Sequence, residues 1–203
     1  MSTTPATPLP THSSPPPTLD FAEVDAWQRL ADGLTRASNP FHILTAATTG
    51  MDGRPKCRTV VLRAVDVSTR RLWFHTDVRS PKVAEMRALP WAALLFYDAE
   101  GKTQVRADCA VTLHHRDAAA EERWAASKPT SRLCYSAEVG SSVRVPVPPA
   151  ISPVDAGGFE NFVGVECRVE RLEWLWLKFT GHTRAEFEYD KSGTRTDAGW
   201  LAP

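Results

Sequence analysis

Closely spaced strand-like runs near the start of the chain constrain its fold more than any other feature. Between residues 41 and 77 the sequence reads FHILTAATT, the turn GMDGRP, KCRTVVLRAVD, the turn VSTRR and then LWFHTD. Such short turns join neighbouring antiparallel strands, whereas parallel strands need long crossover connections. The pattern therefore argues against a doubly wound fold and predicts an antiparallel β-barrel.

Further runs predict the rest of a mainly β fold with flanking helices. Helices are expected in SPKVAEMRAL, which Pro90 ends, and in DAAAEERWAAS. The apolar run WAALLFYDA and the alternating run KTQVRADCAVTLHH are expected to resume the sheet. VGVECRVERLEWLWLKF and AEFEYD are expected to supply the closing strands of a Greek-key-like, antiparallel barrel.

The N-terminal region divides into an arm and a helix. Residues 1–18 are rich in Pro, Ser and Thr and cannot bury enough apolar surface to offset the entropy of ordering, so a disordered arm is predicted. Asp20 is the expected cap of a helix, because apolar residues then recur at helical spacing: Phe21, Val24, Trp27, Leu30 and Leu34. Residues 19–203 are expected to form one domain, with the Pro-rich stretch 143–162 as a loop.

The charge balance and the cysteines argue against several classes of function. With 24 basic and 24 acidic side chains, the chain has no net charge to attract nucleic acid or an anionic membrane. Its four cysteines form neither a CxxC pair nor a Cys/His cluster, so no metal site is expected. Because the sequence shows neither a secretory signal nor a long apolar run, a reduced, cytoplasmic protein is expected.

Two arginines bracket the apolar middle of the second strand, RTVVLRAVD. Arg58 and Arg63 either reach water at the strand ends or contact one ligand about 16 Å long. Strict alternation places the two residues on opposite faces, so a shared ligand requires a strand edge or a β-bulge.

The stretch FHTDVRSPK places polar side chains where a strand gives way to a helix. Free N–H groups at a helix start, the Ser80 hydroxyl and the Lys82 ammonium favour an anion such as phosphate, although Ser80 could simply cap the helix. Gln104 and Arg106 share one face of a later strand, either exposed to water or against the edge of a flavin ring. No Ser-His-Asp, glycine-rich nucleotide or HExxH motif occurs, so no catalytic side chain is identified.

Taken in order, RTVVLR, FHTD with RSPK, LPWAALLFYD, TQVR and the late HTR with WLAP resemble the pyridoxamine 5'-phosphate oxidase family, from Phe41 onward. The resemblance implies an FMN-binding split β-barrel and a homodimer with FMN at the subunit interface. It implies that Arg58, Ser80 and Lys82 hold the phosphate region, and that Arg63, Thr76, Gln104 and Arg184 contact ribityl or ring. The full cofactor set expected is Arg58, Val60, Leu62, Arg63, His75, Thr76, Ser80, Lys82, Gln104 and Arg184.

The chain also departs from the family pattern, and its runs NF, VERLEWLWL, GHTRAEFEYD and GWLAP look closer to a related branch with largely unassigned substrates. The family's second basic residue is Pro81 here, its tyrosine is His75, and its Gln-Ser pair is Glu138 and Val139. Its Arg-x-His is His182-x-Arg184. The residues expected to bind a small, anionic substrate are Lys128, Ser131 and His182.

The sequence thus predicts an FMN-dependent oxidoreductase that transfers a hydride between a small substrate and FMN, with the cofactor supplying the chemistry. Two alternatives stay open at this point. One is a non-catalytic flavin-binding or sensor module of the same fold, and the other is a dimeric scaffold that has lost the flavin.

Overall fold

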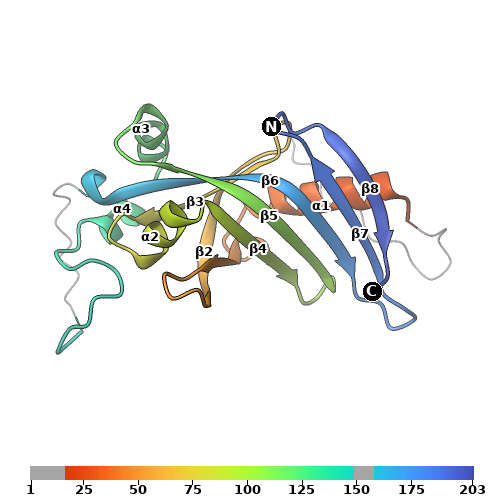
Figure 1. Ribbon diagram of the computed structural model, residues 1–203, viewed down its shortest axis with the longest axis horizontal. Coiled ribbons are helices and arrows are strands. Elements are labelled where there is room, and N and C mark those ends of the chain that lie inside the picture. Colours follow the sequence, from red (N-terminus) through yellow and green to blue (C-terminus); the bar gives the residue numbers. More distant parts are fainter. Residues whose placement is uncertain (1–16, 149–157) are drawn as a thin grey trace.

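The computed structural model describes residues 17–148 and 158–203, which form an antiparallel sheet rolled into a barrel with helices at its ends (Figure 1). Most of the predicted arm, and the middle of the predicted Pro-rich loop, lie outside the described residues. No helix within the described ranges is long and apolar enough to cross a bilayer.

Six strands close the barrel. Their order around the sheet is β3-β2-β1-β4-β5-β6, and β3 pairs again with β6 to complete the ring. Every pairing is antiparallel, which confirms the predicted class of fold. The six strands are β1 (Ile43–Thr49), β2 (Pro55–Asp66), β3 (Arg71–Asp77), β4 (Trp91–Asp98), β5 (Thr103–His114) and β6 (Phe162–Trp176).

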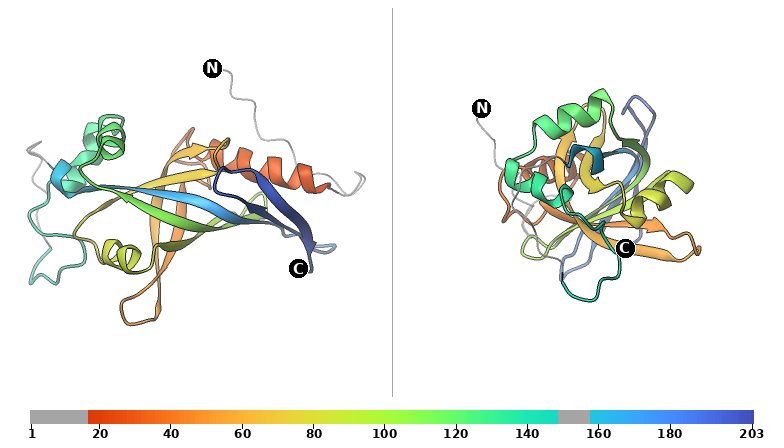
Figure 2. Two further views of the ribbon diagram at one scale, coloured as in Figure 1. Left: turned by 45° about the horizontal axis from the view of Figure 1, so that its top comes forward. Right: turned by 90° about the vertical axis from the view of Figure 1, so that its left-hand side faces the viewer.

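Strand β6 is long enough to take part in two parts of the sheet. Its first half pairs with β3, whereas its second half pairs with β7 (Thr183–Tyr189), which in turn pairs with β8 (Arg195–Leu201). Figure 2 shows β7 and β8 as a flap that extends the sheet beyond the barrel. Strand β8 was not predicted, because its sequence, RTDAGWL, lacks an apolar alternation.

Helix α1 (Leu19–Asp32) covers the end of the barrel that carries β7 and β8 (Figure 1). The prediction that Asp20 caps it is wrong, because Thr18 is the N-cap and its hydroxyl accepts the Phe21 N–H at 3.1 Å. Val24 is 64 % exposed, so the buried stripe is shifted from the expected one. It consists of Ala22, Glu23, Asp25, Ala26, Trp27 and Leu30.

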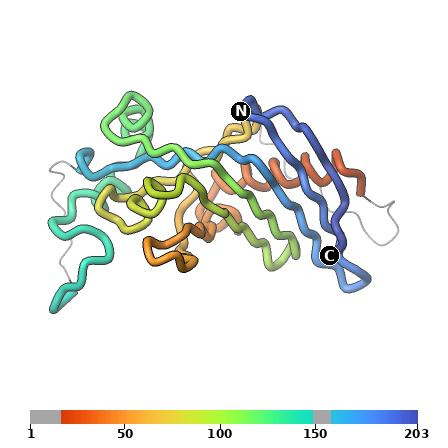
Figure 3. The backbone as a smooth tube through the Cα atoms, in the orientation of Figure 1, coloured from red at the N-terminus to blue at the C-terminus, as the bar shows by residue number. Residues whose placement is uncertain are grey.

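The other helices gather at the opposite end, as the tube in Figure 3 shows. They are α2 (Pro81–Ala88), α3 (Ala118–Ala125) and the short α4 (Pro129–Arg132). A small aromatic cluster, separate from the barrel core, packs under α3 and contains Trp124, Tyr135, Phe159 and Phe162. This end of the barrel holds the candidate site.

Candidate functional site

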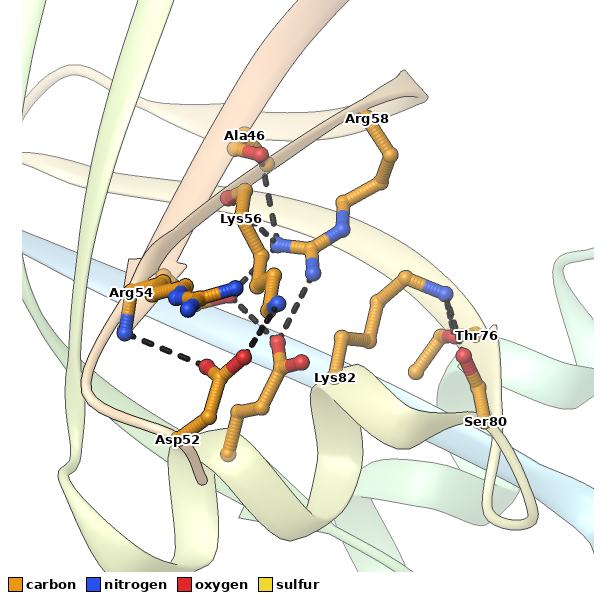
Figure 4. Close-up of polar contacts among 10 residues, drawn as sticks. Ala46, Asp52, Arg54, Lys56, Arg58, Thr76, Ser80 and Lys82 are labelled. Carbon is orange, nitrogen blue, oxygen red and sulfur yellow. Dashed lines mark hydrogen bonds and ion pairs between the residues drawn. The ribbon is translucent and has the colours of Figure 1, made fainter. Parts of the chain in front are cut away.

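The turn between β3 and α2 lies beside the half-buried ammonium group of Lys82. Lys82 Nζ donates to Ser80 Oγ at 2.6 Å and to Thr76 Oγ1 at 3.0 Å (Figure 4). Ser80 stands at the N-cap of α2, and Pro81 at the next position suits the first turn of a helix. The Ser80 side chain makes no capping bond to the helix backbone, so its hydroxyl serves Lys82. Both hydroxyl-bearing residues are buried, and this cluster of Thr76, Ser80 and Lys82 is called the Lys82 pocket below.

Arg58 approaches the same region from β2. Its Nη2 donates to Glu85 Oε2 at 2.7 Å, and its Nη1 donates to Thr48 Oγ1 at 2.5 Å. Thr48 also donates to Glu85 Oε2 at 2.5 Å, so the three side chains form one network between β1, β2 and α2. Glu85 is only 5 % exposed and lies one helical turn after Lys82.

The pocket carries more positive than negative charge. Burial and then the nearby Arg58 guanidinium lower the pKa of Lys82. The charges of Glu85 and Asp77 oppose this shift. Within the described ranges, however, no carboxylate lies within ion-pair distance of Lys82, and Glu85 forms its ion pair with Arg58. A bound anion would relieve this uncompensated charge, since a phosphate accepts several charge-assisted hydrogen bonds.

His75 lies beside this pocket, on the opposite face of β3. Its ring packs edge-on against Phe162, with centroids 4.7 Å apart. Burial, followed by the charges of Arg63 and Arg123, lowers the pKa of His75 to about 4, so the imidazole is neutral at pH 7. Its Nε2 is buried and has no hydrogen-bond partner in the described part of the chain.

A cavity of about 450 Å³ opens next to His75, within the size range of small-molecule and cofactor sites. One wall comes from the end of β3 and the other from the segment that follows α4. The lining residues are His75, Thr76, Asp77, Cys134, Tyr135, Ala137, Val139, Gly140, Ser141, Ser142, Val143 and Val145.

The remaining predicted residues of β2 divide between the two faces of the strand. Leu62 is buried in the barrel core, whereas Val60 is half-buried and packs against that core. A register shift between Leu62 and Ala64 marks a β-bulge at Arg63. Arg63 is exposed, and its charge acts on His75 and Tyr135 at the cavity. Arg58 instead bonds to Thr48 and Glu85, so the two arginines act on different groups.

Gln104 and Arg184 lie on the outer face of the sheet, away from Lys82. Residues directly opposite one another on paired strands face the same side of the sheet. Arg58 therefore shares the inner face with the residues that follow it across the strands, which are Ala46, Leu94 and the fully buried Ala107. Gln104 is three residues from Ala107 and therefore faces outward. Gln104 and Arg184 flank Leu175 on one row, and Arg184 forms an ion pair with Glu173, which also pairs with Arg106.

The predicted substrate residues are not gathered around the cavity. Lys128 is exposed at the N-cap of α4, Ser131 lies within that helix, and His182 is exposed just before β7. Tyr135, which was not singled out, does line the cavity, and burial raises its pKa to about 12.

Three further residues of the site escaped prediction from the sequence. Glu85 follows Lys82 at helical i, i+3 spacing, and this spacing could have revealed it. Thr48 and Tyr135 carry no comparable signal, because only the folded barrel places them beside β2 and β3.

The closed six-stranded barrel with a cationic pocket at its end defines a ligand-binding split barrel. Residues 24–115 match the family described as "Pyridoxamine 5'-phosphate oxidase, FMN-binding domain". A pyridoxine/pyridoxamine 5'-phosphate oxidase of Burkholderia multivorans is 37 % identical over 126 residues, which cover 61 % of this chain and 55 % of the relative. One from Arabidopsis thaliana is 28 % identical over 122 residues, covering 55 % and 62 %. The chain thus spans little more than half the length of these relatives.

Solved structures agree on the fold. A pyridoxamine 5'-phosphate oxidase-related, FMN-binding protein of Nostoc punctiforme is similar with a TM-score of 0.68 and 24 % identity, over 86 % of this chain and 95 % of that one. PhzG of Burkholderia lata, in complex with tetrahydrophenazine-1-carboxylic acid, has a TM-score of 0.67 and 21 % identity, over 93 % and 94 %. Residues 24–115 of this chain thus match an FMN-binding domain of the pyridoxamine 5'-phosphate oxidase type, and FMN is the cofactor that this match indicates. The solved structures show that the fold is the one found in these proteins.

The residues at the barrel end fit an FMN phosphate. An ammonium without a carboxylate partner in the described ranges, two buried hydroxyls and a neighbouring guanidinium form a donor set that suits a phosphate. The adjoining cavity also leaves room for a larger part of a ligand.

Proposed function

We propose that this protein is an FMN-dependent oxidoreductase acting on a small reduced substrate. When bound, FMN accepts a hydride from such a substrate, and this cofactor supplies the chemistry. The observation that carries the proposal is the Lys82 pocket, an uncompensated cation held between two hydroxyls beside a cavity, in a chain of an FMN-binding family.

In this proposal the chain's own groups bind and orient. Lys82, Ser80 and Thr76 donate to the phosphate, while Glu85 and Thr48 fix the direction of the Arg58 guanidinium. His75 stays neutral at pH 7 and adds no charge beside the cavity. No side chain of this set acts as a nucleophile.

We further propose that two chains form each site. Gln104 and Arg184, expected to contact the ring, lie on the outer face, whereas the phosphate pocket lies inside the barrel end. One chain therefore does not complete the predicted site. The outer face next to Gln104 exposes large apolar side chains that a second copy would cover: Ile43, Trp91, Leu95 and Tyr97, which are 37–53 % exposed.

The names of the relatives suggest which substrate to test first. Their names specify pyridoxine and pyridoxamine 5'-phosphate, which makes pyridoxamine 5'-phosphate the first substrate to test. Lys128 and His182, which are exposed, and Ser131 and Arg184, which are half-buried, are proposed to bind its anionic group, although none of them lines the cavity of a single chain.

Comparison of FMN with riboflavin tests the pocket, because riboflavin lacks the phosphate. We expect Lys82→Met to raise the Kd for FMN by about 10- to 100-fold, as for the loss of a charge-assisted hydrogen-bonding group, and to leave riboflavin binding unchanged. Lys191→Met, at an exposed position, is the matched control. Equal effects of Lys82→Met on both flavins would place the phosphate elsewhere.

Catalysis is tested separately, without assuming an electron acceptor. Pyridoxamine 5'-phosphate added anaerobically to the FMN-loaded protein should reduce the flavin and so bleach the visible absorbance of its oxidised form. If bound FMN stays oxidised with this and other reduced substrates, the protein is a non-catalytic flavin-binding module.

A further inference from the structure

Arg79, in the turn between β3 and α2, forms hydrogen bonds with both walls of the cavity. Its Nη1 donates to the backbone carbonyls of Ala137 at 2.9 Å and Glu138 at 3.3 Å. On the other side, its Nε and Nη2 donate to the two carboxylate oxygens of Asp77 at 2.9 and 2.6 Å. One guanidinium thus joins the end of β3 to the segment after α4.

The Asp77 carboxylate fixes the orientation of Arg79. A fork of two parallel N–H donors on one carboxylate is the arrangement that arginine makes and lysine does not. The backbone N–H of Arg79 also donates to Asp77 Oδ1 at 2.8 Å, and the Asp77 hydrogen bonds raise the pKa of Arg79. The ion pair neutralises both charges, so Arg79 acts here as a brace and not as an anion-binding group.

The braced segment forms most of one wall of the cavity. Residues 137–145 contribute Ala137, Val139, Gly140, Ser141, Ser142, Val143 and Val145 to the lining. Among the described residues, Arg79 is the side chain whose hydrogen bonds tie this segment to the barrel. Gly140 lies so close that a Cβ added to it would be 2.8 Å from Arg79 Cβ.

We propose that Arg79 is a positioning residue that holds residues 137–145 against the cavity and thereby slows the escape of bound FMN. The proposal rests on the proposed function, because His75 and Thr76 of the same cavity are the expected flavin contacts. Loss of the brace leaves the Lys82 pocket intact, so the phosphate still binds while the wall beside the rest of the ligand opens.

Two variants separate packing from charge. Arg79→Lys keeps the positive charge but loses the fork that reaches Asp77 and both carbonyls. Gly140→Ala keeps every charge, yet the added methyl group must push the segment away from Arg79. Arg87→Ala, on the exposed side of α2, is the matched control.

The readouts are amide hydrogen exchange of residues 137–145 and the FMN dissociation rate from stopped-flow fluorescence. We expect both cavity variants to speed exchange in this segment, and to speed FMN release by about tenfold, as for the loss of one or two hydrogen bonds. Exchange in β1 to β6 and both readouts of Arg87→Ala should match the wild type.

Two results would overturn the assignment of Arg79. One is unchanged exchange in 137–145, and the other is faster exchange with an unchanged rate of FMN release, which would make the brace purely structural. If the wild-type protein itself binds no FMN, the proposed function fails and this inference fails with it. Failure of the proposed function can be told apart from failure of the Arg79 assignment, because FMN binding by the wild type is measured before any variant is compared.

Discussion

At the scale of single residues, the site depends on groups whose environment sets their charge. His75 is held neutral by burial and by two arginines, although an ordinary histidine in water is half protonated near pH 6.5. Lys82 is the reverse case, a cation kept in a partly desolvated place by two hydroxyls. His75 is thus neutral at pH 7, whereas Lys82 is a cation that favours an anionic ligand.

His75 should make stability fall in mild acid. The unfolded chain binds a proton at His75 near pH 6.5, whereas the folded chain binds it only near pH 4. The free energy of unfolding therefore decreases as pH falls between these values, by about 2 kcal/mol from pH 7 to pH 5. Urea unfolding of wild type and His75→Gln at both pH values measures this, and an equal acid sensitivity of the two proteins would contradict it.

Glu85 should oppose FMN binding while it stabilises the FMN-free protein. Glu85→Gln removes the charge that pairs with Arg58, so unfolding of the FMN-free protein should cost about 1–3 kcal/mol less. The same change leaves the pocket with two uncompensated cations, and FMN should bind more tightly at low salt. Urea unfolding and flavin titration give the two quantities.

Glu122→Gln, at an exposed position, is the control for Glu85→Gln. If Glu85→Gln instead weakens FMN binding, the orientation of the Arg58 guanidinium matters more for binding than the removal of the negative charge.

At the scale of elements, α1 is fastened to the barrel by buried polar pairs as well as by apolar contacts. Trp174 Nε1 of β6 donates to Asp25 Oδ2 at 2.8 Å. Trp27 Nε1 donates at 2.9 Å to the Tyr189 hydroxyl of β7, which donates at 2.9 Å to Glu23 Oε1. Helix α1 thus joins the barrel to the flap of β7 and β8.

Tyr189→Phe should destabilise the fold without changing its shape. The hydroxyl that it removes leaves Trp27 Nε1 buried without its acceptor, and an unsatisfied buried donor costs about 1–3 kcal/mol. Urea unfolding measures the loss. Tyr97→Phe at the same protein concentration is the comparison, because Tyr97 is 48 % exposed, and equal effects of the two changes would contradict a role for the α1 network.

Strand alternation made most of the barrel predictable, because each strand has one buried face. It did not reveal the bulge at Arg63, which depends on pairing with β3 and not on the residues of β2 alone. The stripe of α1 was misplaced because Glu23 and Asp25 are buried through partners far along the chain, Arg70 and Trp174. For the same reason, the motifs could not show that the predicted site residues lie on two faces of the sheet, and the role of those residues stays a prediction.

At the scale of the whole molecule, the split between the two groups of predicted residues has a geometric consequence. Tyr97 pairs with Gln104, Gln104 with Leu175, and Leu175 with Arg184, so the exposed apolar face and the outward polar residues are continuous. A second copy that covered this face would bury the apolar side chains. It would also place one chain's Gln104 and Arg184 at the interface where the family resemblance puts FMN.

A charge in the middle of that face should therefore abolish both association and FMN binding. Leu95 is 37 % exposed and lies opposite Thr45 and Arg106 in the sheet. Arg106 already forms an ion pair with Glu173, so Leu95→Glu would bury a carboxylate between two subunits without a partner charge of its own, which is costly at a protein interface. We expect the wild type to sediment as a dimer and Leu95→Glu to sediment as a monomer.

Val24→Glu is the control, since it places the same charge at a 64 % exposed position on α1 and should leave the dimer intact. If two chains build each site, the Leu95→Glu monomer should lose affinity for riboflavin and for FMN by the same factor, because it lacks the ring contacts and keeps the phosphate contacts. Lys82→Met should instead weaken FMN alone. A Leu95→Glu monomer that binds FMN as tightly as the wild type would show that one chain completes the site, with Gln104 and Arg184 outside it.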